Sequence, residues 1–258
     1  MSNRSNPSKL GFDAVIFDMD GVVTHTALLH SVAWKELFDA YLEERAERNG
    51  EAFREFDAEG DYLTYVDGKP RYKGVQSFLE SRGIDLPSGD QTDGAGQETV
   101  CGLGNAKDAI FERLLHRDGP KLFDSTIALI HELKAAGVQT SIISSSKHCQ
   151  EILQMAGVED LFVTRIDGVK SEALGLKGKP DADIFTKSAE MLGVSVSRSV
   201  VVEDAVSGVQ AGRAGGFALV LGIDRGNNRE ALMANGADIV VNDLAEINVQ
   251  DIDDWFNR

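Results

Sequence analysis

The 258-residue sequence has only two cysteines, Cys101 and Cys149, too few for a disulfide framework or a cysteine metal site. It also lacks a long apolar run and a charged-then-apolar secretory start, which argues against a membrane span and against export. We therefore predict a reducing, cytoplasmic setting. Both thiols are expected to be small buried side chains rather than nucleophiles.

Positive charge is scarce as well. The chain has 26 Lys and Arg residues against 42 Asp and Glu residues, and its formal net charge is −16. Such a surface repels polyanions, so we expect neither nucleic acid nor an anionic membrane as a partner. A local group of cations, or a metal ion, can still reverse the field at one site. The composition therefore leaves small phosphorylated ligands open.

Short β-branched runs alternate with helix-length segments, which predicts a doubly wound parallel α/β sheet. The expected strands are AVIF near Val15, VQTSII ending at Ile143, SVVV ending at Val202, FALVL around Leu219 and DIVV around Ile239. Helices are predicted from an N-cap at Asp124 to Gly137, over 181–192 and over 205–214. The polar residues 1–10 are expected to be a flexible tail, and the fold to begin near Gly11.

The segment 27–121 interrupts this alternation and predicts a helical insert after the first strand. His30, Trp34, Leu37 and Tyr41 recur at helical spacing. Helical patterns continue in VQSFLESRG and NAKDAIFERLLHR, whereas 88–104 is expected to be a loop. The predicted organisation is a core of 11–26 and 122–258 with a helical cap of 27–121.

Two carboxylates, Asp18 and Asp20, follow the first buried strand directly. Side chains in an extended segment alternate, so both should point to one side of the carboxyl edge, where parallel sheets bind ligands. The pair favours a hard divalent cation such as Mg²⁺. Gly21, which permits a tight turn, is also a candidate to bind the substrate. One carboxylate can attack phosphorus while the other handles the leaving-group proton.

Later segments supply complementary groups at the same predicted edge. The serines can hold phosphate oxygens or only cap a helix, Lys179 can neutralise phosphate or be solvated, and Asp204 can be an N-cap. A purely capping Asp204 would leave the acidic residue before it unexplained. The candidates are Ser144, Ser145, Ser146, Lys147, Lys179, Glu203 and Asp204.

Other motifs lack this context. The pairs Asp181/Asp183 and Asp251/Asp253 follow no buried strand. GLGNAK, from Gly102, has two glycines in dinucleotide spacing but lacks a preceding strand and the third glycine, so no nucleotide site is assigned. Three histidines in helical stretches are interpreted as structural and without partners: His116, His131 and His148.

FDMDGVVT, the strand end at Ser144, GKPDADIF and VVVEDAVSG, in this order, resemble the four motifs of the haloacid dehalogenase superfamily. The insert resembles that superfamily's helical cap, and the resemblance covers nearly all of 12–242. Within the superfamily, THTALLHSVAWK, RYKGV and NAKD resemble cap segments of the β-phosphoglucomutase group.

The resemblance implies a role for each motif. Asp18 would be the nucleophile that forms an aspartyl phosphate, and Asp20 the general acid/base with its backbone carbonyl on Mg²⁺. Ser144 and Lys179 would hold the transferring phosphate. The pair that completes the metal site would be Glu203 and Asp204.

Two departures from the group stand out. His25 occupies a position that is usually Asp, and QSF after KGV lacks the Arg that holds the distal phosphate of the substrate. Candidates to replace that Arg are Arg71, Lys73 and Lys107, although Lys and Arg on helices usually face solvent. His30 and Trp34 are candidates to line the cleft, with an ordinary packed helix face as the alternative for Trp34.

Three functions follow from these expectations. The first is a Mg²⁺-dependent phosphotransferase that interconverts β-glucose 1-phosphate and glucose 6-phosphate. The second is a sugar-phosphate phosphatase, in which water takes the phosphate from Asp18. The third is a non-catalytic sensor of phosphate or sugar phosphate. The expected ligand is a small phosphorylated sugar, and the sequence leaves any protein partner unknown.

Overall fold

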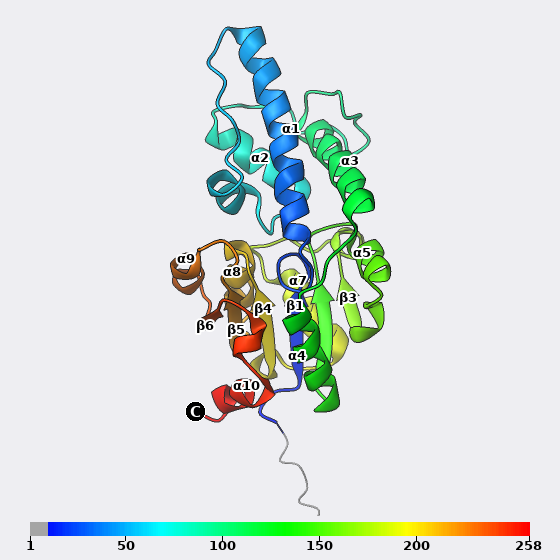
Figure 1. Cartoon of the computed structure of the whole chain (residues 1–258), viewed down its shortest axis with the longest axis vertical. Helices are drawn as coiled ribbons and strands as arrows, with labels where there is room; N and C mark the ends of the chain where they lie inside the picture. Colours follow the sequence, from blue (N-terminus) through cyan, green and yellow to red (C-terminus); the bar gives the residue numbers. More distant parts are fainter. Residues whose placement is uncertain (1–9) are drawn as a thin grey trace, which may run out of the picture.

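The computed structural model describes residues 10–258, in which one six-stranded parallel sheet has the order β3-β2-β1-β4-β5-β6 (Figure 1). Phe17 lies opposite Ile142 on one neighbouring strand and Val202 on the other. The ends of the three central strands therefore meet at one edge. The strands are β1 (Ala14–Asp18), β2 (Gln139–Ile143), β3 (Thr164–Ile166), β4 (Ser199–Glu203), β5 (Leu219–Ile223) and β6 (Ile239–Val241).

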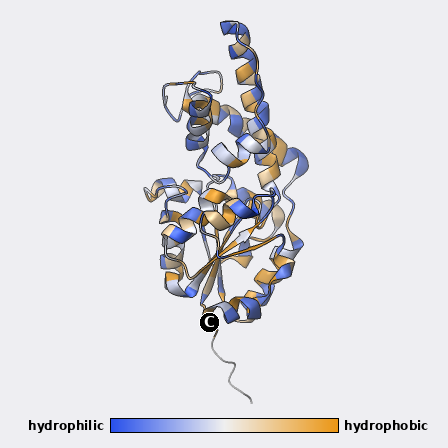
Figure 2. Cartoon of the chain, turned by 90° about the vertical axis from the view of Figure 1, so that its left-hand side faces the viewer, coloured by the Kyte–Doolittle hydropathy of each residue, from blue (hydrophilic) through white to orange (hydrophobic). Residues whose placement is uncertain are grey.

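Helices cover both faces of this sheet. On β1, Val15 and Phe17 pack into a cluster with residues of α4, α5 and α10, whereas Ala14 and Ile16 pack into a second cluster with residues of α7, α8 and α9. Figure 2 shows the apolar strands between more polar outer helix surfaces. These helices are α4 (Asp124–Ala135), α5 (Cys149–Ala156), α6 (Gly168–Ala173), α7 (Asp183–Leu192), α8 (Val206–Ala214), α9 (Arg229–Ala234) and α10 (Val249–Phe256). Single turns are η2 (Glu159–Leu161), η3 (Val196–Arg198) and η4 (Leu244–Glu246).

A helical cap stands over the carboxyl edge of the sheet (Figure 1). It has a hydrophobic cluster of its own, in which Phe38 packs on Phe56 and Phe78. The chain enters and leaves the cap side by side, because Thr24 and Leu122 form an antiparallel bridge. The cap elements are α1 (Thr26–Asn49), η1 (Tyr62–Val66), α2 (Arg71–Ser81) and α3 (Val100–Asp118).

The doubly wound sheet and the helical insert are as the sequence predicts. The short edge strand β3 was not predicted, because it has three residues and two of them are only half-buried. The domain limits at 27 and 121 stay a proposal. The tail predicted over 1–10 lies outside the described residues except for Leu10, whose carbonyl accepts a hydrogen bond from Arg198. Within the described residues, no helix is both long and apolar enough to cross a membrane.

Two local predictions were wrong. The loop predicted over 88–104 ends earlier, because Thr99 caps α3 by accepting a hydrogen bond from the Gly102 amide. Gly104 is helical, and a Cβ there would lie 2.7 Å from the Tyr72 ring, so a glycine allows the close contact. Asp124 is the first residue of α4 rather than its N-cap, which is Phe123.

Candidate active site

A buried lysine joins the ends of two strands. Lys179 Nζ lies 2.5 Å from Asp18 Oδ1, and the same ammonium donates a hydrogen bond to Glu203 Oε1. Burial alone would lower the pKa of Lys179, but the two carboxylates raise it, so the ammonium stays charged. Burial raises the pKa of Asp18 well above its ordinary value, and Lys179 only partly opposes this shift. Lys179 is 1% exposed, so the interpretation of a solvated lysine was wrong.

Three carboxyl groups from β1 and β4 gather where a cation could bind. Asp18, Glu203 and Asp204 each offer an oxygen, and these oxygens lie within 4.8 Å of one another. Burial, and then the nearby Asp67 and Glu203, raises the pKa of Asp204 well above its ordinary value. These are hard oxygen donors, and the one ammonium of Lys179 offsets only part of the charge that three carboxylates would carry, so the donor set suits Mg²⁺. The side chain of Asp20, also a predicted metal residue, is not in this group.

Gly21 contributes through its backbone rather than as a lining residue. Its φ is +83°, and a Cβ at this position would lie 1.7 Å from Asp204 Oδ2. Glycine therefore permits both the turn after β1 and the approach of Asp204. The structure gives Gly21 no place in the cavity wall, where a substrate-binding role had been predicted.

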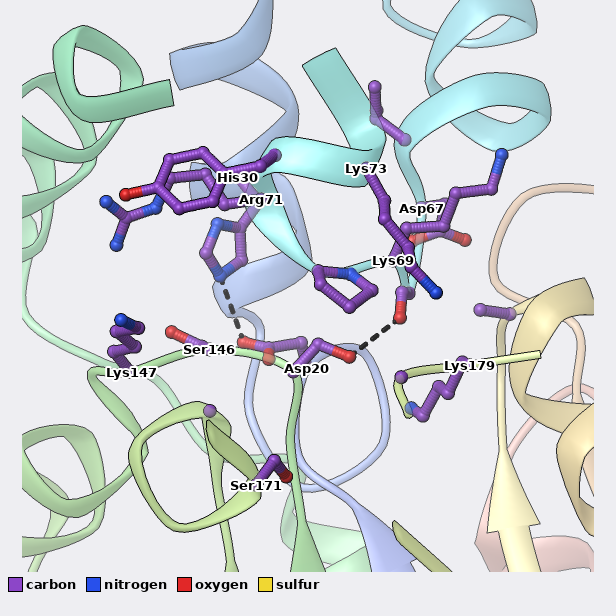
Figure 3. Close-up of a pocket in the computed structure, with 18 of the residues that line it drawn as sticks. Asp20, His30, Asp67, Lys69, Arg71, Lys73, Ser146, Lys147, Ser171 and Lys179 are labelled. Carbon is purple, nitrogen blue, oxygen red and sulfur yellow. Dashed lines mark hydrogen bonds and ion pairs between the residues drawn. The ribbon is translucent and has the colours of Figure 1, made fainter. Parts of the chain in front are cut away.

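Asp20 is held in its charged form by donors from the core and the cap. Its carboxylate accepts hydrogen bonds from Thr26 and, at 3.0 Å, from Ser144 Oγ. His30 Nε2 lies 3.5 Å from Asp20 Oδ1 (Figure 3). Burial would raise the pKa of Asp20, but His30, Thr26 and Ser144 together lower it to about 2.

His30 connects this carboxylate to a buried lysine of the cap. His30 Nδ1 lies 2.6 Å from Lys107 Nζ, and the imidazole stacks on Phe111. Burial, with Lys107 next, lowers the pKa of His30 to about 4. Burial likewise lowers the pKa of Lys107 to about 7. Lys107 is thus a buried member of the site, and Trp34 lies close enough for its ring to face the ammonium, 5.1 Å away.

A cavity of about 450 Å³ lies between the cap and the carboxyl edge of the core. Most of the predicted site residues line it. Ser144 and Glu203 do not line it. Ser144 donates a hydrogen bond to Asp20, and Glu203 accepts one from Lys179, and both of these partners line the cavity. The predicted residues in the wall are Asp18, Asp20, His30, Trp34, Arg71, Lys73, Lys107, Ser145, Ser146, Lys147, Lys179 and Asp204.

Cations from both halves of the molecule face this cavity despite the acidic composition. Arg71 Nη2 lies 2.8 Å from Asp108 Oδ2, and Lys147 Nζ lies 2.5 Å from Glu172 Oε2. Figure 3 shows Arg71 and Lys147 on one side of Asp20 and Lys179 on the other. Each of these two cations is paired with a carboxylate of the cavity wall, so an anionic ligand would have to share it with that carboxylate.

The turn after η1 was missed by sequence reasoning, although it brings a carboxyl group to the cavity. The backbone carbonyl of Asp67 accepts a hydrogen bond from Ser207 Oγ at 3.1 Å, and that of Gly68 accepts one from Ser145 Oγ at 2.8 Å. Burial, and then Glu203, raises the pKa of Asp67 to about 7. Asp67-Gly68 looks like an ordinary turn in the sequence, so no pattern signals its place.

The histidine predictions need correction in part. His148 Nε2 lies 3.0 Å from Asp108 Oδ1, and His116 Nε2 lies 2.8 Å from Glu151 Oε1, so both have partners. His25 stacks on Phe123 with ring centroids 3.6 Å apart, at the crossing between core and cap. At this position, which is usually Asp in the resembled group, the chain therefore has a histidine that stacks on an aromatic ring.

Comparison with known proteins agrees with this geometry. A family model described as haloacid dehalogenase-like hydrolase matches residues 12–216. A beta-phosphoglucomutase of Mycobacterium bovis is 48% identical over 237 residues, which are 91% of this chain and 90% of the relative. A trehalose-phosphate phosphatase of Mycobacterium leprae is 37% identical over 131 residues, 49% of this chain and 29% of that protein. The crystal structure of a beta-phosphoglucomutase from Clostridium difficile superposes with a TM-score of 0.72 at 22% identity, covering 95% of this chain and 97% of that one.

Proposed function

The chain belongs to the haloacid dehalogenase-like hydrolase family and is an enzyme, a phosphomutase or a phosphatase; from this premise we propose a Mg²⁺-dependent phosphomutase of small sugars. The proposed reaction interconverts β-glucose 1-phosphate and glucose 6-phosphate. The observation that carries the proposal is one cavity that joins Asp18 and Lys179 to a separate cationic end at Arg71 and Lys147.

In the proposed reaction, an oxygen of Asp18 attacks phosphorus and the sugar oxygen leaves. Lys179, already on Asp18, would hold the phosphoryl oxygens with Ser144. Asp18, Glu203 and Asp204 would hold Mg²⁺, together with the carbonyl of Asp20, and the bound cation would neutralise charge on the transferring group. Fixed positions of these groups would supply most of the rate enhancement.

Asp20 is suited to proton transfer at the sugar oxygen. With a pKa of about 2, it is a carboxylate at neutral pH and can accept the proton of a sugar hydroxyl that attacks the phosphorylated Asp18. In the reverse step it returns that proton to the leaving oxygen. Its hydrogen bonds from Thr26 and Ser144 fix the carboxylate for this task.

A second anion site favours the mutase over the phosphatase. Arg71, Ser146 and Lys147 line the side of the cavity away from Lys179 (Figure 3), where a distal phosphate could bind while the other phosphate is at Asp18. Arg71 would thus do the work of the Arg that is missing after KGV, with Lys73 at the exposed rim. A sugar bisphosphate could then turn within the closed cavity and return its other phosphate.

The alternative is a sugar-phosphate phosphatase, which the relative named trehalose-phosphate phosphatase keeps open. Incubation with β-glucose 1-phosphate, Mg²⁺ and a trace of the bisphosphate separates the two. Glucose 6-phosphate as product supports the mutase, and free phosphate alone supports the phosphatase. The sensor alternative is not supported by the relatives described above, because they are named as enzymes.

Two variants test the chemical roles in the same assay. Asp18→Asn should abolish transfer with every phosphate donor, whereas Asp20→Ala should still transfer phosphate slowly to the protein. Full activity of Asp18→Asn would contradict the mechanism.

The cytoplasmic setting stays a proposal, supported by two cysteines that are both buried and free.

A further inference from the structure

Arg225, in the loop between β5 and α9, contacts the turn that follows Asp20, although it belongs to none of the motifs read from the sequence. Its Nε donates a hydrogen bond of 2.9 Å to the backbone carbonyl of Gly21. Its Nη1 lies 3.3 Å from both the Asn242 carbonyl and Asp243 Oδ2, just after β6. Arg225 is not among the residues that line the cavity, so it can influence a ligand there only through other residues.

The backbone of Gly21 is held on both sides. Its amide donates a hydrogen bond of 2.8 Å to the Thr24 carbonyl, and its own carbonyl accepts the bond from Arg225. With a φ of +83° and no side chain, Gly21 has little conformational restraint of its own. The peptide group between Asp20 and Gly21 is planar and trans, so a fixed Gly21 amide also fixes the direction of the Asp20 carbonyl. That carbonyl is the proposed backbone ligand of Mg²⁺.

The same guanidinium packs on the crossing between core and cap. Arg225 Cζ lies 3.7 Å from the ring centroid of Phe123, and the His25 ring stacks on Phe123 with centroids 3.6 Å apart. Two groups this close to one ring centre must occupy opposite faces, so Phe123 lies between an imidazole and a guanidinium. The Phe123 amide also donates to the Val23 carbonyl at 3.0 Å. Arg225 therefore connects the turn after β1 to the segment that returns from the cap.

The loop of Arg225 is not arranged for stability alone. Arg225 Nη2 and Asn228 Oδ1 are both buried without a hydrogen-bond partner in the described part of the chain. Each such group costs about 1–3 kcal/mol, and an exception of this kind often marks a functional position. Asn228 Nδ2 meanwhile lies 3.4 Å from the Asp204 carbonyl. The loop thus reaches the backbone of both acidic turns, at Gly21 and at Asp204.

We propose that Arg225 is a positioning residue for the metal site, because it fixes the direction of the Asp20 carbonyl through Gly21. This inference rests on the proposed function, since it concerns the cation which that function requires. Removing an outer contact that orients a metal ligand typically weakens metal binding by about 10–100-fold. The metal site would thus depend on a loop after β5 as well as on the acidic residues of β1 and β4.

Calorimetric titration of the protein with Mg²⁺, without any sugar, tests this role. Arg225→Met keeps the apolar stem but removes every donor, so it should weaken Mg²⁺ binding about tenfold. Arg225→Lys keeps one donor for the Gly21 carbonyl, and its affinity should lie between those of wild type and Arg225→Met. The loss of a positive charge near acidic groups would by itself strengthen binding of a cation, so weaker binding distinguishes positioning from simple electrostatics.

The matched control is Arg213→Met. Arg213 Nε also donates to a glycine carbonyl, that of Gly236, and its guanidinium also pairs with an aspartate, Asp238. This arginine contacts neither acidic turn, so its variant should bind Mg²⁺ as tightly as wild type. Urea unfolding without Mg²⁺ checks that each variant is folded, and Arg225→Lys carries the test if Arg225→Met is not.

Unchanged Mg²⁺ affinity in the folded Arg225 variants, or an equal loss in Arg213→Met, would overturn the proposal. Asp204→Asn separates this result from failure of the proposed function. If wild type binds no Mg²⁺, or if Asp204→Asn binds it equally well, the proposed metal site fails and the role of Arg225 fails with it. If Asp204→Asn weakens binding and the Arg225 variants do not, only the role of Arg225 is wrong.

Discussion

Lys179 Nζ and Asp18 Oδ1 are 2.5 Å apart in the buried floor of the cavity. The ammonium also donates to Glu203, so one cation joins the ends of β1 and β4. Because Lys179 contacts the proposed nucleophile, it should contribute both to the free energy of unfolding and to phosphoryl transfer. Removing the lysine leaves carboxylates buried without a counter-charge.

Lys179→Met should therefore lower the free energy of unfolding by about 3–5 kcal/mol and abolish phosphoryl transfer. Urea unfolding with and without Mg²⁺ measures the first effect, and Mg²⁺ should restore part of the loss by replacing the missing charge. Lys187→Met, which breaks an exposed pair with Glu190, should change stability by less than about 1 kcal/mol. A Lys179→Met protein as stable as wild type without Mg²⁺ would show that the pair is not an electrostatic support.

Magnesium affinity should increase with pH. Burial raises the pKa of Asp18 and of Asp204, so protons must leave these carboxyl groups before the ion can bind. Calorimetric titration should show tighter binding at pH 8 than at pH 6, with proton release at the lower pH. Asp204→Asn should weaken binding, whereas Asp181→Asn, in an Asp-x-Asp pair outside the acidic cluster, should not. Equal affinity at both pH values would argue against binding at these groups.

Acid should destabilise the protein partly through His30. The folded state lowers the pKa of His30 from 6.5 to about 4, so between these values the unfolded chain binds more protons. Stability must then fall as pH drops through this window, by up to about 3 kcal/mol from this group. Denaturant unfolding at pH 7 and pH 4.5 should show a smaller loss for His30→Gln than for wild type. His131→Gln, on an exposed position of α4, serves as the control, and an identical loss in both variants would exclude this role for His30.

Ser145 and Ser207 should hold the cap closed. Each donates from the core to a cap carbonyl, at Gly68 and Asp67. The double alanine variant should raise KM for the sugar phosphate about thirtyfold, because each hydrogen bond contributes about 1 kcal/mol to the closed state. Small-angle scattering should show a more extended average shape. Ser197→Ala, in an exposed pair with Ser195, should change neither measurement. A double variant that stays compact and keeps its KM would show that these two hydrogen bonds do not hold the cap closed.

The strand ends were predictable because each carries a local signal. Asp18 follows a continuous apolar run, and Glu203 follows another, so their meeting at one sheet edge follows from parallel topology alone. The same reasoning gave the order of helices and strands in the core. It could not give β3, whose three residues have too weak a pattern.

The cap side of the site could not be predicted in this way. Lys107 resembles any helix-surface lysine, and only the packing of α3 against α1 buries it beside His30. Asp67 and Gln91 lie in turns, where position depends on contacts with distant residues. His148 has two partners: Glu151, three positions on, is at a spacing that the sequence shows, whereas Asp108 is forty positions away and reaches it across the cleft.

The paired crossing at Thr24 and Leu122 has an evolutionary consequence. Since both connections pass through one narrow junction, a different set of helices could be grafted there while the sheet keeps the carboxylates at its edge. Such an exchange would alter which molecule is recognised and leave the bond-breaking chemistry intact. Related proteins could therefore diverge by exchanging the helical cap while the sheet core stays the same.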